Sequence, residues 1–95
     1  MIRHIVFFTA RDPADIDRIE AGLHMLAEIP DHTHFEVRRA LHTDRLTDRE
    51  IDIVVYVEFA DAEALARYKA HPTYAACIAR VRPLREMRYA ADIES

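Results

Sequence analysis

The chain has a single cysteine and no long hydrophobic run. One cysteine cannot form an internal disulfide, which agrees with a reducing compartment. The apolar run near the amino terminus is too short for a signal peptide and has no small-residue cleavage site, and no segment approaches the length of a membrane span. We therefore expect a cytoplasmic protein with no membrane partner.

The chain also lacks a basic stripe. Its 13 basic and 17 acidic residues are interspersed and leave a formal net charge of -4 at pH 7. Nucleic-acid-binding surfaces concentrate Lys and Arg on one face, so we expect no nucleic-acid partner. Repeats, linkers and low-complexity segments are absent too, and 95 residues, 51% of them hydrophobic, suffice for one core. We expect one domain over residues 1–95.

Hydrophobic periodicity predicts the order strand, helix, strand, strand, helix pair and strand. Strands are expected where β-branched and aromatic residues alternate with others, over residues 2–10, 34–41, 51–59 and 86–93. Helices are expected between capping aspartates and prolines, from Asp12 to Pro30 and from Asp61 to Pro83 with a restart at Pro72. The polar run from His42 to Glu50 is predicted to be a hairpin loop.

The βαββαβ order is that of a ferredoxin-like sandwich, an α+β fold in which helices cover one face of an antiparallel four-stranded sheet. The second face of the predicted sheet is also apolar, with Ile5, Phe7, Val54 and Tyr56. A large exposed apolar face usually marks an interface. We therefore expect a homodimer that packs sheet against sheet as a dimeric α+β barrel, while Val55 and Val57 face the chain's own helices.

Two tyrosines and a histidine surround a predicted helix break. A residue before proline is disfavoured in a helix, so His71 is expected at a corner between two helices. Side chains three apart share a helix face, so Tyr68 and His71 could point the same way, with Tyr74 returning toward them. The alternative is that both tyrosines pack in the core and His71 only caps a helix.

His4 and Asp92 are further polar candidates, on the first and last predicted strands. His4 is either a polar group in a pocket or a buried histidine bonded to a backbone carbonyl, and we expect the second. Asp92 either orients His4 through a hydrogen bond or is a solvated charge near the chain end. We expect the solvated charge.

The remaining nucleophile and metal-ligand candidates carry weaker patterns. No motif accompanies Cys77, which we expect to pack in the core as a small hydrophobe. His32 and His34 lie two apart and would share one strand face, as two metal ligands would need. Because no third ligand stands at a fixed spacing, we expect no metal site.

The sequence resembles the stress-responsive A/B barrel domain family, within the dimeric α+β barrel superfamily, over essentially the whole chain. The resemblance rests on four segments: Ile2 to Phe8, Val57 to Leu65, Tyr68 to Pro72, and Arg82 to Leu84 with Asp92 beyond it. It implies a homodimer with a small ligand pocket in each subunit, between sheet and helices. It does not imply one activity. Plant members similar to this chain act as cofactor-free polyketide cyclases, which promote an intramolecular aldol condensation.

The cyclase pattern is matched at His4, Tyr68, His71 with Pro72, and Asp92. It departs at Tyr74, where those cyclases have a second histidine that resembles the general base. A phenol titrates near ~10 and is a poor base at neutral pH, so His4 or His71 would have to take over.

Two functions therefore stay open, neither of which needs a cofactor. The first is a binding protein of unassigned activity, linked to stress, that holds a small, partly apolar molecule. The second is a cofactor-free enzyme, either cyclase-like or monooxygenase-like. The candidate catalytic residues are His4, His71, Tyr68 and Tyr74. The candidate ligand contacts are His4, Phe8, Val55, Val57, Tyr68, Tyr74 and Asp92.

Overall fold

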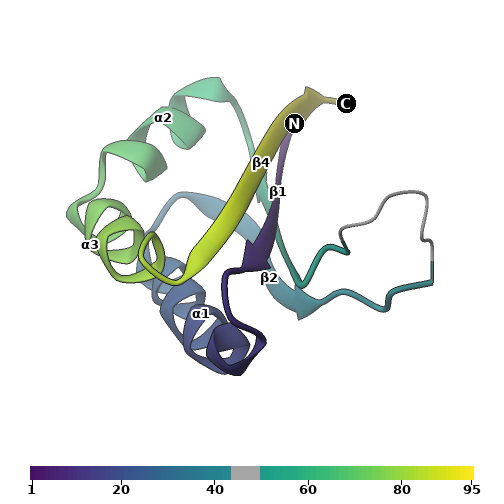
Figure 1. The fold of residues 1–95 in the computed structure, drawn as a ribbon. Coiled ribbons are helices and arrows are strands. Elements are labelled where there is room, and N and C mark those ends of the chain that lie inside the picture. The colour runs from purple at the N-terminus through teal and green to yellow at the C-terminus, as the bar shows by residue number, and fades with distance from the viewer. Residues whose placement is uncertain (44–49) are drawn as a thin grey trace.

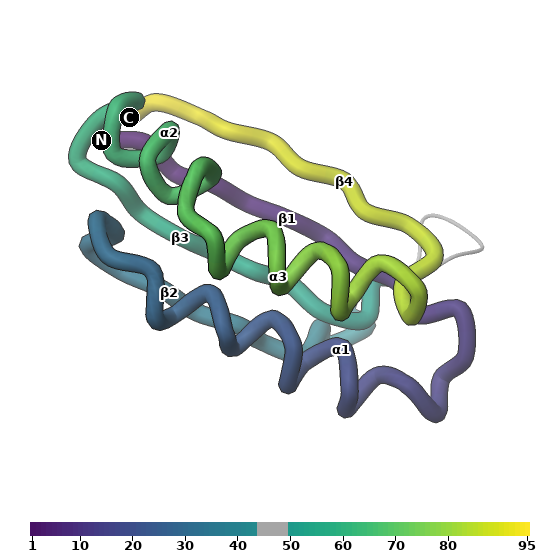
Figure 2. Tube along the Cα trace, turned by 90° about the vertical axis from the view of Figure 1, so that its left-hand side faces the viewer, coloured from purple at the N-terminus to yellow at the C-terminus, as the bar shows by residue number. Residues whose placement is uncertain are grey.

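The computed structural model describes residues 1–43 and 50–95 as a four-stranded antiparallel sheet with helices on one face (Figure 1). The elements are β1 Ile2–Ala10, the 3₁₀ helix η1 Pro13–Asp15, α1 Ile16–Leu23, the 3₁₀ helix η2 His24–Glu28, β2 His32–Arg39, β3 Ile53–Phe59, α2 Ala62–Ala70, α3 Pro72–Val81 and β4 Arg85–Glu94. The strand order is β2-β3-β1-β4. Figure 2 shows α1 and α3 side by side across the covered face. The predicted ferredoxin-like α+β architecture is confirmed.

The predicted helix starts are confirmed, but the first helix is not continuous. The carboxylate of Asp12 accepts the backbone N–H of Ala14 (2.9 Å), and that of Asp61 accepts the N–H of Ala64 (2.8 Å). Between Asp12 and Pro30 the chain forms η1, α1 and η2 instead of one helix. The buried residues Leu23, Leu26 and Ile29 are three apart, which suits the three-residue turn of a 3₁₀ helix. None of the described helices is long and apolar enough to cross a membrane.

The predicted hairpin strands were misplaced by two residues. β2 covers residues 32–39 instead of 34–41, and β3 begins at Ile53 instead of Ile51. The sequence alternation continues past the strand pair, where Leu41 is 85% exposed because none of the described elements lies against it. His32 pairs with Phe59 and His34 with Glu58 across an irregular register, so the expected shared face for the two histidines is also wrong. The core of the predicted loop, residues 44–49, lies outside the described residues.

The two sheet faces are assigned as predicted. Val55, Val57 and Phe59 are buried on the face that the helices cover. The opposite face carries Ile5, Phe7, Val54 and Tyr56, joined on β4 by Tyr89 and Ile93. No described helix lies on this second face, and Phe7, Tyr89 and Ile93 are 37%, 60% and 48% exposed.

A β-bulge on β4 changes which side chains face the helices. Phe8 pairs with Arg88 and Ala10 with Arg85, so two residues of β4 stand opposite Thr9 alone. The buried hydroxyl of Thr9 accepts the backbone N–H of Met87 (3.0 Å) and holds the bulge. Directly paired residues project to the same side of a sheet, and Phe8 and Ala10 are two apart on β1. Arg85 and Arg88 therefore lie on the helix-covered side.

Candidate functional site

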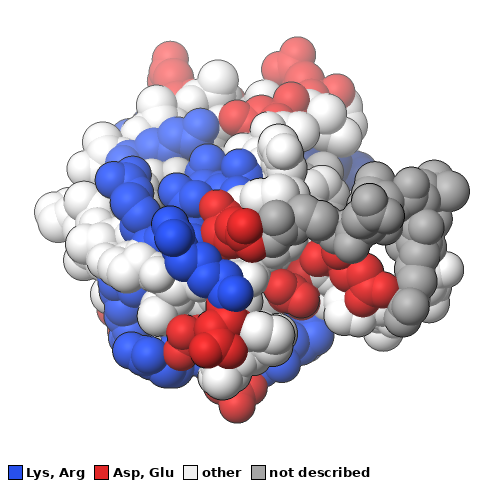
Figure 3. Space-filling view, viewed as in Figure 1, with Lys and Arg blue, Asp and Glu red and all other residues white. Residues whose placement is uncertain are grey.

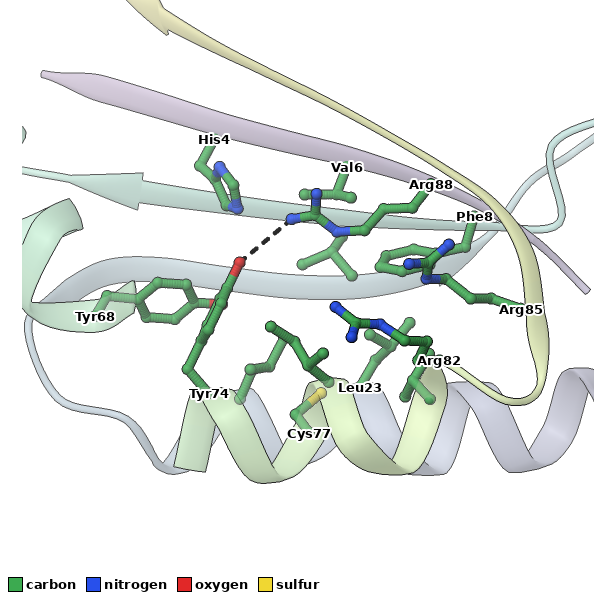
Figure 4. A pocket seen from close by; sticks show the side chains of 14 residues that line it. His4, Val6, Phe8, Leu23, Tyr68, Tyr74, Cys77, Arg82, Arg85 and Arg88 are labelled. Atoms are coloured by element: carbon green, nitrogen blue, oxygen red, sulfur yellow. Dashed lines mark hydrogen bonds between the residues drawn. The ribbon is translucent and has the colours of Figure 1, made fainter. Parts of the chain in front are cut away.

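A pocket of about 180 Å³ lies between the covered sheet face and the helices (Figure 4). Its walls are mostly apolar, with polar groups at both ends, and the lining residues are His4, Val6, Phe8, Leu23, Leu26, Val55, Tyr68, Tyr74, Cys77, Ile78, Val81, Arg82, Arg85 and Arg88. An apolar cavity of about 150 Å³ accommodates a benzene molecule. The pocket is therefore large enough for one ring or a short aliphatic chain.

At one end, His4 of β1 is bonded to Asp92 of β4. The two residues are register partners, so antiparallel pairing puts their side chains on the same side of the sheet. His4 Nδ1 lies 2.5 Å from Asp92 Oδ1. An ionised carboxylate can only accept, so Nδ1 carries the proton and donates it, and Nε2 of the neutral ring is left as an acceptor. Both earlier expectations, a backbone carbonyl partner for His4 and a merely solvated Asp92, are wrong.

The environment keeps this pair as a neutral imidazole on a carboxylate. Burial lowers the pKa of His4, which is 2% exposed, although the hydrogen bond and the charge of Asp92 oppose the shift. Burial raises the pKa of the Asp92 carboxyl, but the hydrogen bond to His4 and the Lys69 ammonium 3.5 Å away outweigh this effect. The pKa of Asp92 therefore lies below its usual range. At neutral pH, Nε2 therefore offers a lone pair that can accept a proton or a hydrogen bond.

The two tyrosines lie beside His4, one from each side of the helix break. The ring of Tyr68 is fully buried and packs edge to face on Tyr74, with centroids 5.4 Å apart, and on His4 at 6.1 Å. Burial raises the pKa of Tyr68, so its phenol stays protonated, and its hydroxyl has no hydrogen-bond partner among the described residues. The hydroxyl of Tyr74 accepts a hydrogen bond from Arg88 Nη2 (3.2 Å; Figure 4).

Three predicted site residues lie outside the lining. His71 is at the corner between α2 and α3, where its Nδ1 accepts the backbone N–H of Thr73 (3.1 Å) and caps α3. Val57 is buried in the core without lining the pocket, and Asp92 acts through His4. The structure therefore brings His4, Tyr68 and Tyr74 together and leaves His71 aside. Phe8 and Val55 line the pocket as predicted contacts.

Sequence reasoning missed Arg82, Arg85 and Arg88, which line the pocket from the side opposite Tyr68. Of these, Arg88 reaches as far as Tyr74. Alternation along a regular strand would put residues 85 and 88 on opposite faces, and only the bulge beside Thr9 brings them together. The sequence did hold one signal for this cluster: four of the nine residues from 80 to 88 are arginines.

Nothing in the described ranges, 1–43 and 50–95, resembles a metal centre: no three His, Cys, Asp or Glu side chains there could hold an ion. Cys77 lines the pocket wall, where its thiol lies 3.5 Å from the carbonyl oxygen of Gly22. Burial raises the pKa of this thiol to about 11. A thiol that stays protonated is a weak nucleophile, so Cys77 serves as a small apolar wall residue.

Fold and site together define a ferredoxin-like α+β protein with a ring-sized pocket between sheet and helices. The family model for the stress responsive A/B barrel domain matches residues 2–95, and the chain belongs to this family. Curated proteins include no significant match.

Solved structures of the same fold include proteins with and without a described activity. A Dabb family protein from Mesorhizobium loti is 29% identical, with a TM-score of 0.84 over 99% of this chain and 95% of that one. A dimeric ferredoxin-like protein of unknown function from Thermobifida fusca is 25% identical, with a TM-score of 0.78 over 97% and 88%. SnoaB, a cofactor-independent oxygenase from Streptomyces nogalater, is 18% identical, with a TM-score of 0.71 over 99% and 91%, and shares the fold alone.

Proposed function

We propose that the protein binds a small, partly apolar molecule in this pocket, with His4, Tyr68 and Tyr74 as polar contacts. The observation that carries the proposal is the buried hydroxyl of Tyr68, which lines the pocket and has no partner among the described residues. Buried polar groups are nearly always hydrogen-bonded, so this donor is suited to a ligand oxygen. Nε2 of His4, fixed by Asp92, supplies an acceptor beside it. A cytoplasmic location and a role in stress are parts of the same proposal.

A matched pair of tryptophan variants tests this proposal. Ile78 lines the pocket, whereas Ala79, the next residue of α3, is exposed and does not. Binding of 4-methylphenol, a one-ring phenol that fits the volume, is followed by calorimetry and by ¹⁵N chemical shifts. We expect Ile78→Trp to abolish binding by filling the pocket and Ala79→Trp to leave it unchanged. Equal binding by both variants would place the phenol elsewhere and refute the proposal.

We also propose that the protein works as a homodimer that covers the second sheet face. Support comes from the exposed apolar side chains there and from the dimeric Thermobifida fusca relative. Tyr56, half-buried at the centre of this face, would lie in the interface. Tyr56→Lys should therefore weaken the dimer in sedimentation experiments, because a charge in an apolar interface is unfavourable, while Leu41→Lys should not. A wild-type monomer at micromolar concentration would disprove this arrangement.

A second candidate function, cofactor-free proton abstraction, is favoured by the bonded pair of His4 and Asp92. Neutral Nε2 could take a proton from carbon next to a carbonyl, and Asp92 would stabilise the imidazolium that forms. The test is exchange of the α-protons of phenylacetone in heavy water, followed by NMR. Acceleration that His4→Gln removes would support this function. A rate equal to that in buffer would exclude it for this ketone class.

A further inference from the structure

We propose that the ligand is an acid: a small carboxylate or related oxyanion that lies on Arg82, Arg85 and Arg88 while its apolar body fills the pocket. This inference rests on the proposed function, since the same pocket must bind a small molecule.

The three guanidinium groups converge from two elements. Arg82 caps the carboxyl end of α3, and Arg85 and Arg88 come from β4, on the same side because of the bulge. Figure 4 shows all three side chains extending over the pocket from the side opposite Tyr68, with Arg88 reaching Tyr74. Figure 3 shows that basic side chains gather on the face that carries α3 and β4, although the whole chain has a net charge of -4.

Four other arginines of the chain have an acidic partner, whereas these three have none among the described residues. Arg18, Arg38, Arg39 and Arg67 each form an ion pair with a carboxylate. Among the described residues no carboxylate pairs with Arg82, Arg85 or Arg88, and the side-chain partner of Arg88 is the neutral hydroxyl of Tyr74. Arg11, whose Nε donates to the carbonyl of Arg85 (3.0 Å), adds another positive charge nearby.

The crowding has an electrostatic consequence for Arg85. Burial, together with the charges of Arg82, Arg88 and Arg11, lowers its pKa. Like charges held together are unfavourable until an anion neutralises them, and a planar guanidinium binds a carboxylate through two parallel hydrogen bonds. The chemistry that fits this end of the pocket is therefore an oxyanion.

The two ends of the pocket also constrain the shape of the acid. The guanidinium groups of Arg82 and Arg85 lie away from Tyr68 and His4, and that of Arg88 reaches Tyr74 beside them. Apolar side chains such as Val6 and Val55 line the same pocket. A ring with a carboxylate at one position and a hydroxyl or carbonyl oxygen opposite to it would satisfy both ends. For this reason 4-hydroxybenzoate is a suitable probe.

The test compares 4-hydroxybenzoate with 4-hydroxybenzamide, which has nearly the same shape and no charge. By calorimetry we expect the acid to bind at least about tenfold more tightly, the usual scale of a charge-assisted hydrogen bond. Arg85→Gln should weaken binding of the acid about tenfold and leave the amide unchanged. Arg85→Lys should restore part of the loss, because it keeps the charge without the planar fork. Arg80→Gln, on exposed α3 surface outside the pocket, should change neither affinity.

The possible failures can be told apart. If acid and amide bind equally and Ile78→Trp blocks both, the pocket binds small molecules but the acid inference is wrong. If Arg80→Gln weakens the acid as much as Arg85→Gln does, general charge attraction explains the preference and the site is again refuted. If 4-methylphenol, the acid and the amide all fail to bind the wild-type protein, the proposed function fails and the inference with it.

Discussion

Removal of the Asp92 carboxylate is the sharpest test of how the polar end of the pocket is built. Asp92→Ala removes the acceptor of the Nδ1–H of His4, and His4 is only 2% exposed. An unsatisfied buried donor costs about 1–3 kcal/mol. Because the Asp92 side chain is 37% exposed, water can replace part of the hydrogen bond. We therefore expect the free energy of unfolding to fall by about 1–2 kcal/mol. Asp92→Asn keeps an acceptor, so the free energy of unfolding of this variant should fall by less than about 1 kcal/mol.

The pKa of His4 should fall further in both variants. Burial lowers it below 6.5 in the wild type, while the hydrogen bond and the charge of Asp92 partly raise it. Asp92→Ala removes both contributions, and Asp92→Asn removes the charge. His4 of the unfolded chain binds a proton at about pH 6.5, whereas His4 of the folded chain binds it only at lower pH. The contribution of His4 to stability is therefore complete above pH 6.5 and is lost as the pH falls toward the folded pKa. In the variants the loss should extend to lower pH than in the wild type.

Urea unfolding at pH 8, 6.5 and 5, at one fixed protein concentration, and NMR titration of the His4 ring measure both effects. Each kcal/mol corresponds to about 4–8 °C in Tm for a domain of this size. Glu94→Ala is the control, because Glu94 lies two residues further along the same strand and pairs with Ile2 instead of His4. If the pKa of His4 is unchanged or higher in both variants, the bond between His4 and Asp92 does not control the ring.

Three further substitutions test other contacts. Tyr68→Phe removes a buried hydroxyl that has no partner among the described residues, so unfolding by urea should need at least as much denaturant as before, while 4-methylphenol affinity should fall; undiminished affinity would dismiss Tyr68 as a contact. Tyr74→His should increase condensation of a model polyketide, because imidazole titrates near ~6.5; wild-type turnover that is equally fast would contradict this reasoning. Gly22→Ala would place a Cβ 2.8 Å from Val81 Cγ2. The cost of overpacking, about 1–3 kcal/mol, should exceed the helix-propensity gain of about 1 kcal/mol, so the free energy of unfolding should fall. Adding Val81→Ala should relieve the clash.

Local patterns predicted the parts of the fold that local chemistry determines. The capping carboxylates of Asp12 and Asp61 and the corner at His71 require only neighbouring residues, and all three are observed. The faces of β1 and β3 followed from simple alternation of buried and open positions. The strand ends did not follow, because Leu41 continues the alternation at a position that no helix or strand of the described ranges buries.

Two register shifts, the bulge on β4 and a similar one on β2 at Thr33, explain most of what sequence reasoning missed. A bulge shifts the alternation by one residue, and its position depends on a partner strand distant in the chain. One bulge separates His32 from His34, and the other brings Arg85 and Arg88 to the same side. The pairing of His4 with Asp92 likewise depends on the register between β1 and β4. Both residues were candidates and matched the cyclase pattern, but spacing alone could not decide whether they are hydrogen-bonded, and it did not reveal the arginines.

The antiparallel ladder between β1 and β4 joins the two ends of the chain and completes the pocket. The two chain termini meet at one end of the ladder, where Ser95 donates its backbone N–H to the carbonyl of Met1 (3.0 Å). His4 and Asp92, which pair within the ladder, are 88 positions apart along the chain. Contacts of such separation slow folding, because the entropy of closing a long loop must be overcome before they form. A chain still lacking β4 on the ribosome has neither the His4 partner nor two of the arginines. Binding by this pocket therefore requires β4 to be paired, and a bound ligand should slow hydrogen exchange in β4 more than in β3.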